Sequence, residues 1–358
     1  MHEGKGQRKR KRNGINGTFD DGQEDSRKEV LRGVDELFAS AREYASSARF
    51  RELMDFTGRF KQYAPYNAML IYLQRPGARF VLSAGHWMRD YHRVVMTDRR
   101  PILILSPNGP LRCLFDVADT QVLPGAKDTF PPELLHPFEG DSGREVPPEW
   151  LADLKTCLSC LGICHGTMRT GESFAGKIEI GGSGDPAVKV PLDGERVLPW
   201  RPAYSIRVAE GSSATVQFAS IVHDLGHLFC RHLPDAYGGK TRWRRISPDA
   251  AEFEAESVSW LVGKRLGVAP PSDRYLSEYL QDGREIPWET SVEEILKATT
   301  LVEHMLADRG EALAWFRQRC PAFREAWEKK SRERRKTHAP QGDSGTREKT
   351  GTLFDPPG

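Results

Sequence analysis

Residues 218–229 read Phe-Ala-Ser-Ile-Val-His-Asp-Leu-Gly-His-Leu-Phe and form the most informative run in the chain. Its large apolar side chains recur at the spacing of one helix face, and they are Phe218, Val222, Leu225 and Phe229. This pattern predicts a helix over about residues 214–232 that buries one stripe. His223 and His227 are one turn apart, so their imidazoles project from the same face.

Two histidines at this spacing can share one tetrahedral Zn²⁺ through their ring nitrogens. An isolated pair more often lines an ordinary helix surface, so the third ligand decides between the two interpretations. A second predicted helix supplies it. Ser247 is a good N-cap, Pro248 suits the first helical position, and Gly267 is a natural stop, which bounds this helix at residues 248–266.

The second helix carries two glutamates one turn apart, Glu252 and Glu256. They point the same way, so one can bind the metal while the other orients a ligating histidine. The spacing alone leaves open which of them does which.

This arrangement resembles the gluzincin metallopeptidases, whose signature is His-Glu-x-x-His followed by a glutamate on a later helix. Residues 252–256, Glu-Phe-Glu-Ala-Glu, are similar to the Glu-x-x-Ala-Asn of the ImmA/IrrE metallo-endopeptidase family. Over about residues 200–270, the resemblance implies a zincin-like domain with Zn²⁺ as cofactor. It implies Glu252 as the third ligand and Glu256 as the partner of a ligating histidine, with Glu254 as the alternative ligand.

The residue between the histidines departs from that family, since Asp224 stands where the family has glutamate. The resemblance implies that Asp224 is the general base for hydrolysis of peptide bonds in an intracellular protein. Aspartate is one methylene shorter and reaches less far. The alternative is therefore an antirestriction-type protein that binds single-stranded DNA and whose metal domain is catalytically weak or inert.

That alternative comes from the N-terminal half of the chain. Residues 63–76 read Tyr-Ala-Pro-Tyr-Asn-Ala-Met-Leu-Ile-Tyr-Leu-Gln-Arg-Pro, and residues 114–120 read Leu-Phe-Asp-Val-Ala-Asp-Thr. With Trp87 between them, these runs resemble the single-stranded-DNA-binding domain of ArdC-type antirestriction proteins. Aromatic rings can stack on bases and arginines can hold phosphates, although the same residues could form a core and its solvated rim. The candidate nucleic-acid residues are Tyr63, Tyr66, Asn67, Arg75, Trp87, Arg93, Arg99 and Arg100.

The expected fold class is α+β, with a small ArdC-like domain followed by a minimal zincin-like metallopeptidase domain. Helical spacing and short β-type runs place the first domain at residues 28–130. A segment rich in Pro and Gly, residues 131–147, is the expected linker, and the second domain covers residues 148–330. Residues 1–27 and 331–358 are polar, contain basic runs, and are expected to be disordered.

Bulk composition excludes two classes of protein. The chain has 358 residues, a net charge of +2 and a hydrophobic fraction of 38%. Without an apolar run of about 20 residues it should not span a membrane, and six scattered cysteines do not make a disulfide framework, so we expect a cytoplasmic protein. Cys157, Cys160 and Cys164 are expected to be buried helix cysteines. His232 and the run Trp243-Arg244-Arg245 have no assigned role.

Overall fold

The computed structural model describes residues 47–106, 109–127, 144–169, 176–193, 196–268 and 285–337. Both expected terminal tails lie largely outside these ranges, as does most of the expected linker. Of the linker, residues 144–147 are described, and Val146 is buried with its N–H donated to Thr215 Oγ1 at 2.9 Å.

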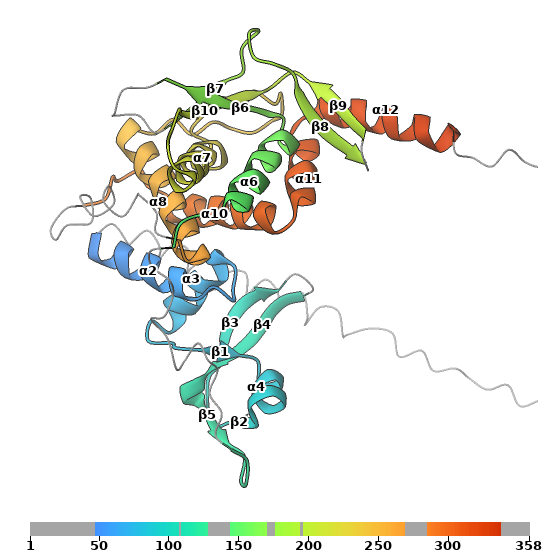
Figure 1. Cartoon of the computed structure of the whole chain (residues 1–358). Coiled ribbons are helices and arrows are strands. Elements are labelled where there is room, and N and C mark those ends of the chain that lie inside the picture. The colour runs from blue at the N-terminus through green and yellow to red at the C-terminus, as the bar shows by residue number, and fades with distance from the viewer. Residues whose placement is uncertain are drawn as a thin grey trace, which may run out of the picture.

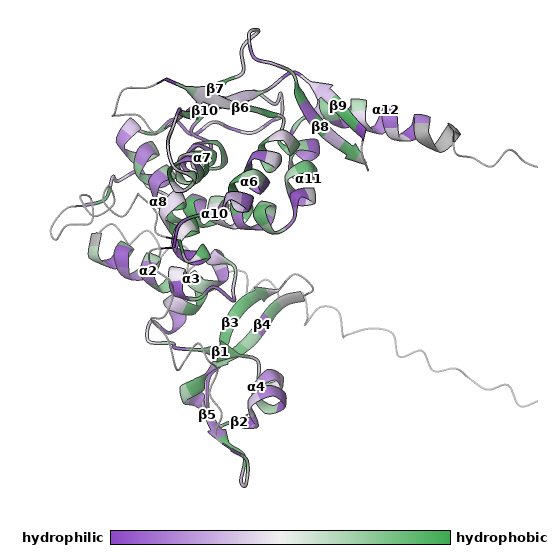
Figure 2. Ribbon diagram, viewed as in Figure 1, coloured by the Kyte–Doolittle hydropathy of each residue, from purple (hydrophilic) through white to green (hydrophobic). Residues whose placement is uncertain are grey.

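The first part of the described chain contains three helices and a set of short strands. The first two helices are α2 (Ser47–Arg59) and α3 (Pro65–Gln74). They are followed by β1 (Val81–Leu82), α4 (Ala84–Tyr91), β2 (Arg93–Val95), β3 (Ile102–Ser106), β4 (Gly109–Asp116), the 3₁₀ turn η1 (Val117–Asp119) and β5 (Thr120–Val122). β3 and β4 pair antiparallel, and β1 pairs with the other side of β4. β3 is apolar along its length (Figure 2).

The second part begins with α6 (Pro148–Cys160) and contains most of the sheet and helix structure. Its strands are β6 (Ile163–Met168), β7 (Gly176–Ile180), β8 (Val188–Asp193), β9 (Arg196–Trp200) and β10 (Tyr204–Ala209). Its later helices are α7 (Ala214–Phe229), α8 (Pro248–Leu266), α10 (Val292–Ala307), α11 (Arg309–Arg319) and α12 (Pro321–Thr337). α12 thus continues past residue 330, where the tail was expected to begin.

A mixed three-stranded sheet covers one side of α7. β10 is its central strand, parallel to β6 and antiparallel to β7, while β8 and β9 form a separate hairpin. Figure 1 shows this sheet at one end of the molecule and the β1–β5 region at the other, with the helices between. In the second part the strands β6–β10 come in one run and the helices from α7 onward in another, without a regular alternation. The fold is therefore α+β, as the sequence predicted.

The main hydrophobic core extends across the expected domain boundary. α2 packs on α8 and α3 packs on α10, so that Phe50 of α2 contacts Phe253 of α8 with ring centroids 5.1 Å apart. A second, small cluster in the described chain consists of Phe80, Trp87 and Val117, within the β1–β5 region. None of the helices in the described parts of the chain combines the length and apolar character that crossing a bilayer requires.

Candidate metal centre

α7 and α8 carry the predicted ligands, and their ends follow from local chemistry. Ser213 caps α7 by accepting the N–H of Val216, and Ser247 caps α8 by accepting the N–H of Ala250. Gly267 ends α8 in the left-handed conformation with φ 78°, a backbone geometry that suits glycine. The bounds of α8 agree with the sequence prediction at both ends.

A close approach between the two helices turns their polar residues toward one another. A Cβ atom placed on Gly226 would lie 3.0 Å from Cα and 3.1 Å from the carbonyl oxygen of Ala255. Glycine at this position therefore lets α7 and α8 pack backbone to backbone. His223 and His227 of α7 then face Glu252 and Glu256 of α8.

Three ligand atoms converge at this contact. The Nε2 atoms of His223 and His227 are 3.0 Å apart, and they lie 3.3 Å and 3.4 Å from the two carboxylate oxygens of Glu252. Bonds of about 2.0–2.1 Å to a tetrahedral Zn²⁺ would place ligand atoms about 3.3 Å from one another. These residues form one of two groups in the described chain that could hold a metal ion.

The centre is open on the side of Glu252. The Glu252 side chain is 50% exposed, whereas those of His223 and His227 are 22% and 13% exposed. Three protein ligands with one accessible side are typical of catalytic zinc sites, whereas structural sites are closed by a fourth protein ligand.

Both imidazoles are oriented through their second nitrogen. Glu256 lies 2.8 Å from Nδ1 of His223, which is the arrangement expected from the sequence. Nδ1 of His227 lies 3.0 Å from Nδ1 of His232, a contact that the sequence did not indicate. In each ring Nε2 therefore faces the site, as a metal ligand requires.

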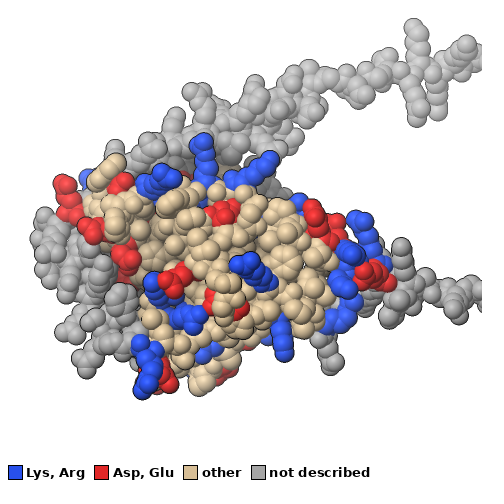
Figure 3. All heavy atoms as spheres, turned by 90° about the horizontal axis from the view of Figure 1, so that it is seen from above, with Lys and Arg blue, Asp and Glu red and all other residues tan. Residues whose placement is uncertain are grey.

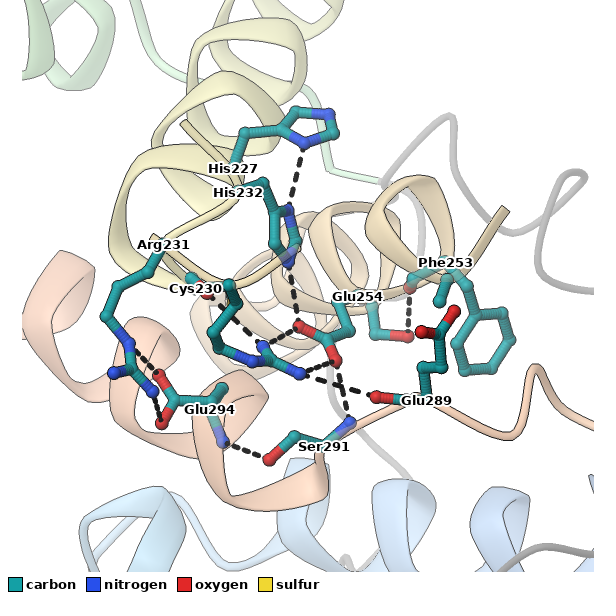
Figure 4. Close-up of polar contacts among 12 residues, drawn as sticks. His227, Cys230, Arg231, His232, Phe253, Glu254, Glu289, Ser291 and Glu294 are labelled. Carbon is teal, nitrogen blue, oxygen red and sulfur yellow. Dashed lines mark hydrogen bonds and ion pairs between the residues drawn. The ribbon is translucent and has the colours of Figure 1, made fainter. Parts of the chain in front are cut away.

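Glu254, the alternative ligand, points elsewhere. Its carboxylate accepts hydrogen bonds from His232 Nε2 at 2.8 Å and from both terminal nitrogens of Arg244 at 2.6 Å and 2.9 Å. The backbone N–H of Ser291 donates to the same group at 2.7 Å (Figure 4). Because four donors occupy its two oxygens, Glu254 does not serve as the alternative ligand of the His223–His227 pair in this structure.

The electrostatics of the metal-free centre follow from its short contacts. Burial alone would lower the pKa of His223, but hydrogen bonds to Glu252 and Glu256 raise it to about 10. The same histidines hold the pKa of Glu252 well below its usual range. Burial lowers the pKa of His227, which therefore remains neutral.

Asp224, the expected base, is buried beside this centre. Burial raises its pKa to about 7, the charge of His223 opposes this rise, and the charge of Glu252 adds to it. A hydrogen bond with the backbone of Ile178 in β7 also acts on the carboxylate. Its Oδ2 is one of the few buried side-chain atoms among the described residues without a hydrogen-bond partner. A buried carboxylate oxygen without a partner can accept a proton from a water molecule or a substrate.

His232 and Arg244 belong to the site, although the sequence gave them no role. The expected helix ran to residue 232, but α7 ends at Phe229, and Arg231 takes a left-handed φ of 65°. This turn folds His232 back beneath His227. No helical spacing connects the two residues, so no pattern in the sequence could have identified the contact.

Two amide side chains of α3, within the run at residues 63–76, have a structural task. Asn67 exchanges two hydrogen bonds with the backbone of Leu105, at 3.0 Å and 3.1 Å, and Gln74 does the same with Leu103, at 2.8 Å and 2.9 Å. They satisfy the edge of β3 as a neighbouring strand would. Asn67 is therefore occupied by the backbone rather than directed at a ligand.

Most other candidate nucleic-acid residues are also engaged within the fold. Trp87 is fully buried and donates to the carbonyl of Phe115, so its ring offers no face for stacking. Tyr63 donates to the carbonyl of Val81, Arg75 pairs with Asp119, and Arg93 is buried against Thr120.

Three candidates remain at the surface or close to it. Tyr66 is partly buried and packs against the main core, while Arg99 and Arg100 are exposed. Figure 3 shows the opposite end of the molecule from the β1–β5 region, and there basic and acidic side chains of the described residues are interspersed.

The three central cysteines are buried, as expected, but they do not share one helix. Cys157 and Cys160 lie in α6, whereas Cys164 lies in β6. Burial raises the pKa of all three thiols, so they are not suited to binding metal as thiolates.

Comparison with known proteins adds little to this geometry. No protein-family model and no curated protein matches the chain. Two solved structures align with it, the antirestriction protein ArdC from plasmid R388 without metal and the same protein bound to Mn(II). The metal-free structure has 16% identity and a TM-score of 0.30, the Mn(II)-bound one 14% and 0.33, and both alignments cover 70% of this chain and 84% of the other. Scores this low carry no argument about function, so the candidate site rests on its own geometry.

Proposed function

We propose that the chain is a Zn²⁺-dependent hydrolase that cleaves peptide bonds of a protein substrate. The observation that carries the proposal is the convergence of His223, His227 and Glu252 at ligand–ligand distances of 3.0–3.4 Å, on a side open to solvent. This donor set of two imidazoles and one carboxylate is the one used by zinc peptidases of the thermolysin type.

The chain's own residues would divide the work. His223, His227 and Glu252 would hold the ion, which when bound supplies Lewis-acid chemistry and lowers the pKa of water. Glu256 keeps the imidazole of His223 in orientation, and His232 contacts the imidazole of His227. Asp224, buried and with one unpartnered oxygen, is the group that accepts the proton from the attacking water.

The test compares zinc binding and cleavage in three forms of the full chain. Wild type, Asp224→Asn and His223→Ala are purified, loaded with Zn²⁺, and assayed against a quenched-fluorescence peptide library. We expect wild type to bind one ion and cleave, and Asp224→Asn to keep the ion while losing on the order of 10²-fold or more in rate. His223→Ala should lose both.

Two outcomes would contradict the proposal. If wild type does not retain zinc after unbound metal has been removed by dialysis, the proposed metal centre is contradicted. Zinc-loaded wild type that cleaves no faster than Asp224→Asn would remove the hydrolase while leaving the metal centre in place.

The second candidate is an antirestriction-type protein that binds single-stranded DNA and whose metal centre is weak or inert. Two observations favour it: the short side chain of Asp224 in the base position, and the exposed pair Arg99 and Arg100 in the β1–β5 region. Fluorescence titration with a single-stranded oligonucleotide at two salt concentrations tests it. The candidate requires affinity that falls with salt and that drops further in Arg99→Gln/Arg100→Gln.

A further inference from the structure

A line of buried polar contacts leads from the metal centre into the protein. It runs from His227 Nδ1 to His232 Nδ1 at 3.0 Å, and from His232 Nε2 to Glu254 at 2.8 Å (Figure 4). It ends at the guanidinium of Arg244, which pairs with Glu254 through two nitrogens. The side chains of His232 and Glu254 are 2% and 0% exposed, so water does not compete for these contacts.

The same residues could be taken for a second metal site, because Cys230, His232 and Glu254 offer ligand atoms close together. Their partners argue against this. Glu254 already accepts four hydrogen bonds, and the cationic Arg244 lies where an ion would need to approach. Burial and the charge of Glu254 raise the pKa of Cys230 far above its usual value, so it would not bind metal as a thiolate.

The fold holds His232 in place at a local cost. The residue before it, Arg231, adopts φ 65°, a left-handed conformation that is unfavourable for a residue with a side chain. It is fixed there by two hydrogen bonds to Glu294 of α10, at 2.7 Å and 3.2 Å. Trp243 donates its indole N–H to the carbonyl of His232 at 3.0 Å. Contacts from α10, from Trp243 and from Glu254 of α8 thus hold the imidazole of His232 against His227.

We propose that His232, held by Glu254 and Arg244, is a positioning residue that fixes the tautomer of His227 with Nε2 free to bind the metal. The inference rests on the proposed metal centre and assigns it a part that the sequence motif does not contain. It also explains why the two ligating histidines have different partners, a carboxylate for His223 and an imidazole for His227.

The direction of the protons follows from the acceptor at the end of this line. Glu254 is a carboxylate and only accepts, so Nε2 of His232 carries the proton that is donated to it. In the tautomer with its proton on Nε2, the other ring nitrogen carries none. Nδ1 of His232 is then an acceptor, and His227 must donate from its own Nδ1. This leaves Nε2 of His227 unprotonated and directed at the metal position.

A matched pair of variants isolates this contact. Asn and Leu have nearly the same shape, and both are too short to reach Glu254 from the position of Nε2, but only Asn can place an acceptor, its amide oxygen, near the position of Nδ1. We compare His232→Asn, His232→Leu and wild type, with the exposed His304→Leu as control. The measurements are zinc affinity by competition with a chromophoric chelator and thermal stability of the metal-free chain.

We expect His232→Leu to bind Zn²⁺ about 10–100-fold more weakly than wild type, His232→Asn to recover much of that loss, and both to melt at similar temperatures without metal. Equal zinc affinity in the Asn and Leu variants would overturn the proposal, since it would show that His232 only fills space.

Imidazole ¹⁵N spectra of the metal-free wild type give a second measurement, independent of metal binding. We expect His232 to carry its proton on Nε2, and a proton on Nδ1 of His232 would overturn the inference. If wild type bound no zinc, the proposed function would fail. The ¹⁵N spectra would still show whether His232 carries its proton on Nε2, and so whether this line of contacts exists.

Discussion

Glu252 and Glu254 lie two residues apart on α8, and we expect their substitution to affect different properties, zinc binding for Glu252 and stability for Glu254. Glu252 is half exposed, whereas Glu254 is fully buried against Arg244 and His232. Glu254→Ala leaves a largely buried guanidinium without its partner, so it should lower the free energy of unfolding by about 3–5 kcal/mol. Glu252→Ala should change it by less than about 1 kcal/mol and abolish tight zinc binding. Urea unfolding and zinc competition on both variants check these expectations.

The matched positions provide the control for that prediction. Both substitutions remove a carboxylate from the same helix, so any difference in stability comes from the surroundings and not from helix propensity. Comparable destabilisation by the two variants would contradict the distinction drawn between a metal ligand and a structural carboxylate.

The cysteines offer a prediction about chemical reactivity. Cys113 of β4 is exposed, while the other five cysteines of the chain are buried. Burial raises the pKa of Cys157 to about 12, so almost none of it is the reactive thiolate at pH 8. Brief treatment of the folded chain with iodoacetamide at pH 8 should therefore modify Cys113 alone, as read by peptide mass spectrometry. Early labelling of Cys157 or Cys160 would contradict the buried positions of these side chains in α6.

Gly226 sets the spacing of α7 and α8, and so the geometry of the metal centre. Alanine is the better helix former by about 1 kcal/mol, but its methyl group would press on the backbone of Ala255, and overpacking costs about 1–3 kcal/mol. Because backbone atoms cannot rotate away, we expect the helices to separate. Zinc affinity in Gly226→Ala should then fall on the order of tenfold, measured by chelator competition.

Gly85 of α4 is the matched control for that substitution. A Cβ atom on Gly85 would meet nothing within 4 Å, so Gly85→Ala should leave zinc affinity unchanged. If Gly226→Ala also left zinc affinity at the wild-type value, the close helix contact would not be what aligns the ligands.

Elements with chemical signals at their own ends were predictable from sequence, whereas some strands that depend on pairing, such as β6 and β8, were not. α8 was bounded correctly because Ser247, Pro248 and Gly267 act locally. β8 contains Pro191, and β6 contains Gly166, residues that weaken a strand pattern. These strands exist because β9 and β10 pair with them, which no local pattern reveals.

The residues of the candidate site show the same difference between local patterns and tertiary contacts. Helical spacing paired His223 with His227 and Glu252 with Glu256, because each pair lies within one turn. The family resemblance then implied which glutamate is the ligand and which is the partner of a histidine. The partner of His227 depends on a left-handed residue after the helix end and on contacts from α10. In the N-terminal part, the run at residues 63–76 suggested ligand contacts. There Asn67 instead satisfies the edge of β3, a task that becomes visible only when helix and strand are in place.

At the scale of the whole molecule, one buried arginine joins the N-terminal helices to the metal-binding part. Arg265, at the end of α8, pairs with Glu303 of α10 and donates to the carbonyls that follow and end α2. Those carbonyls belong to Thr57, Phe60, Lys61 and Tyr63. The guanidinium thus spans the boundary that the sequence placed between two domains.

Arg265→Met should therefore uncouple α2 and α3 from the rest of the molecule. The methionine keeps much of the apolar stem but leaves Glu303 and these four carbonyls without their donor. We expect the free energy of unfolding to fall by about 3–5 kcal/mol. In wild type we expect urea unfolding by circular dichroism and by tryptophan fluorescence to coincide, since the core is shared. In the variant, hydrogen exchange should rise first in α2 and α3, whereas the exposed control Arg332→Met should change stability by less than about 1 kcal/mol. Exchange that rises equally in α2 and in the β6–β10 sheet would mean that Arg265 stabilises the molecule as a whole and does not act as the joint between its two parts.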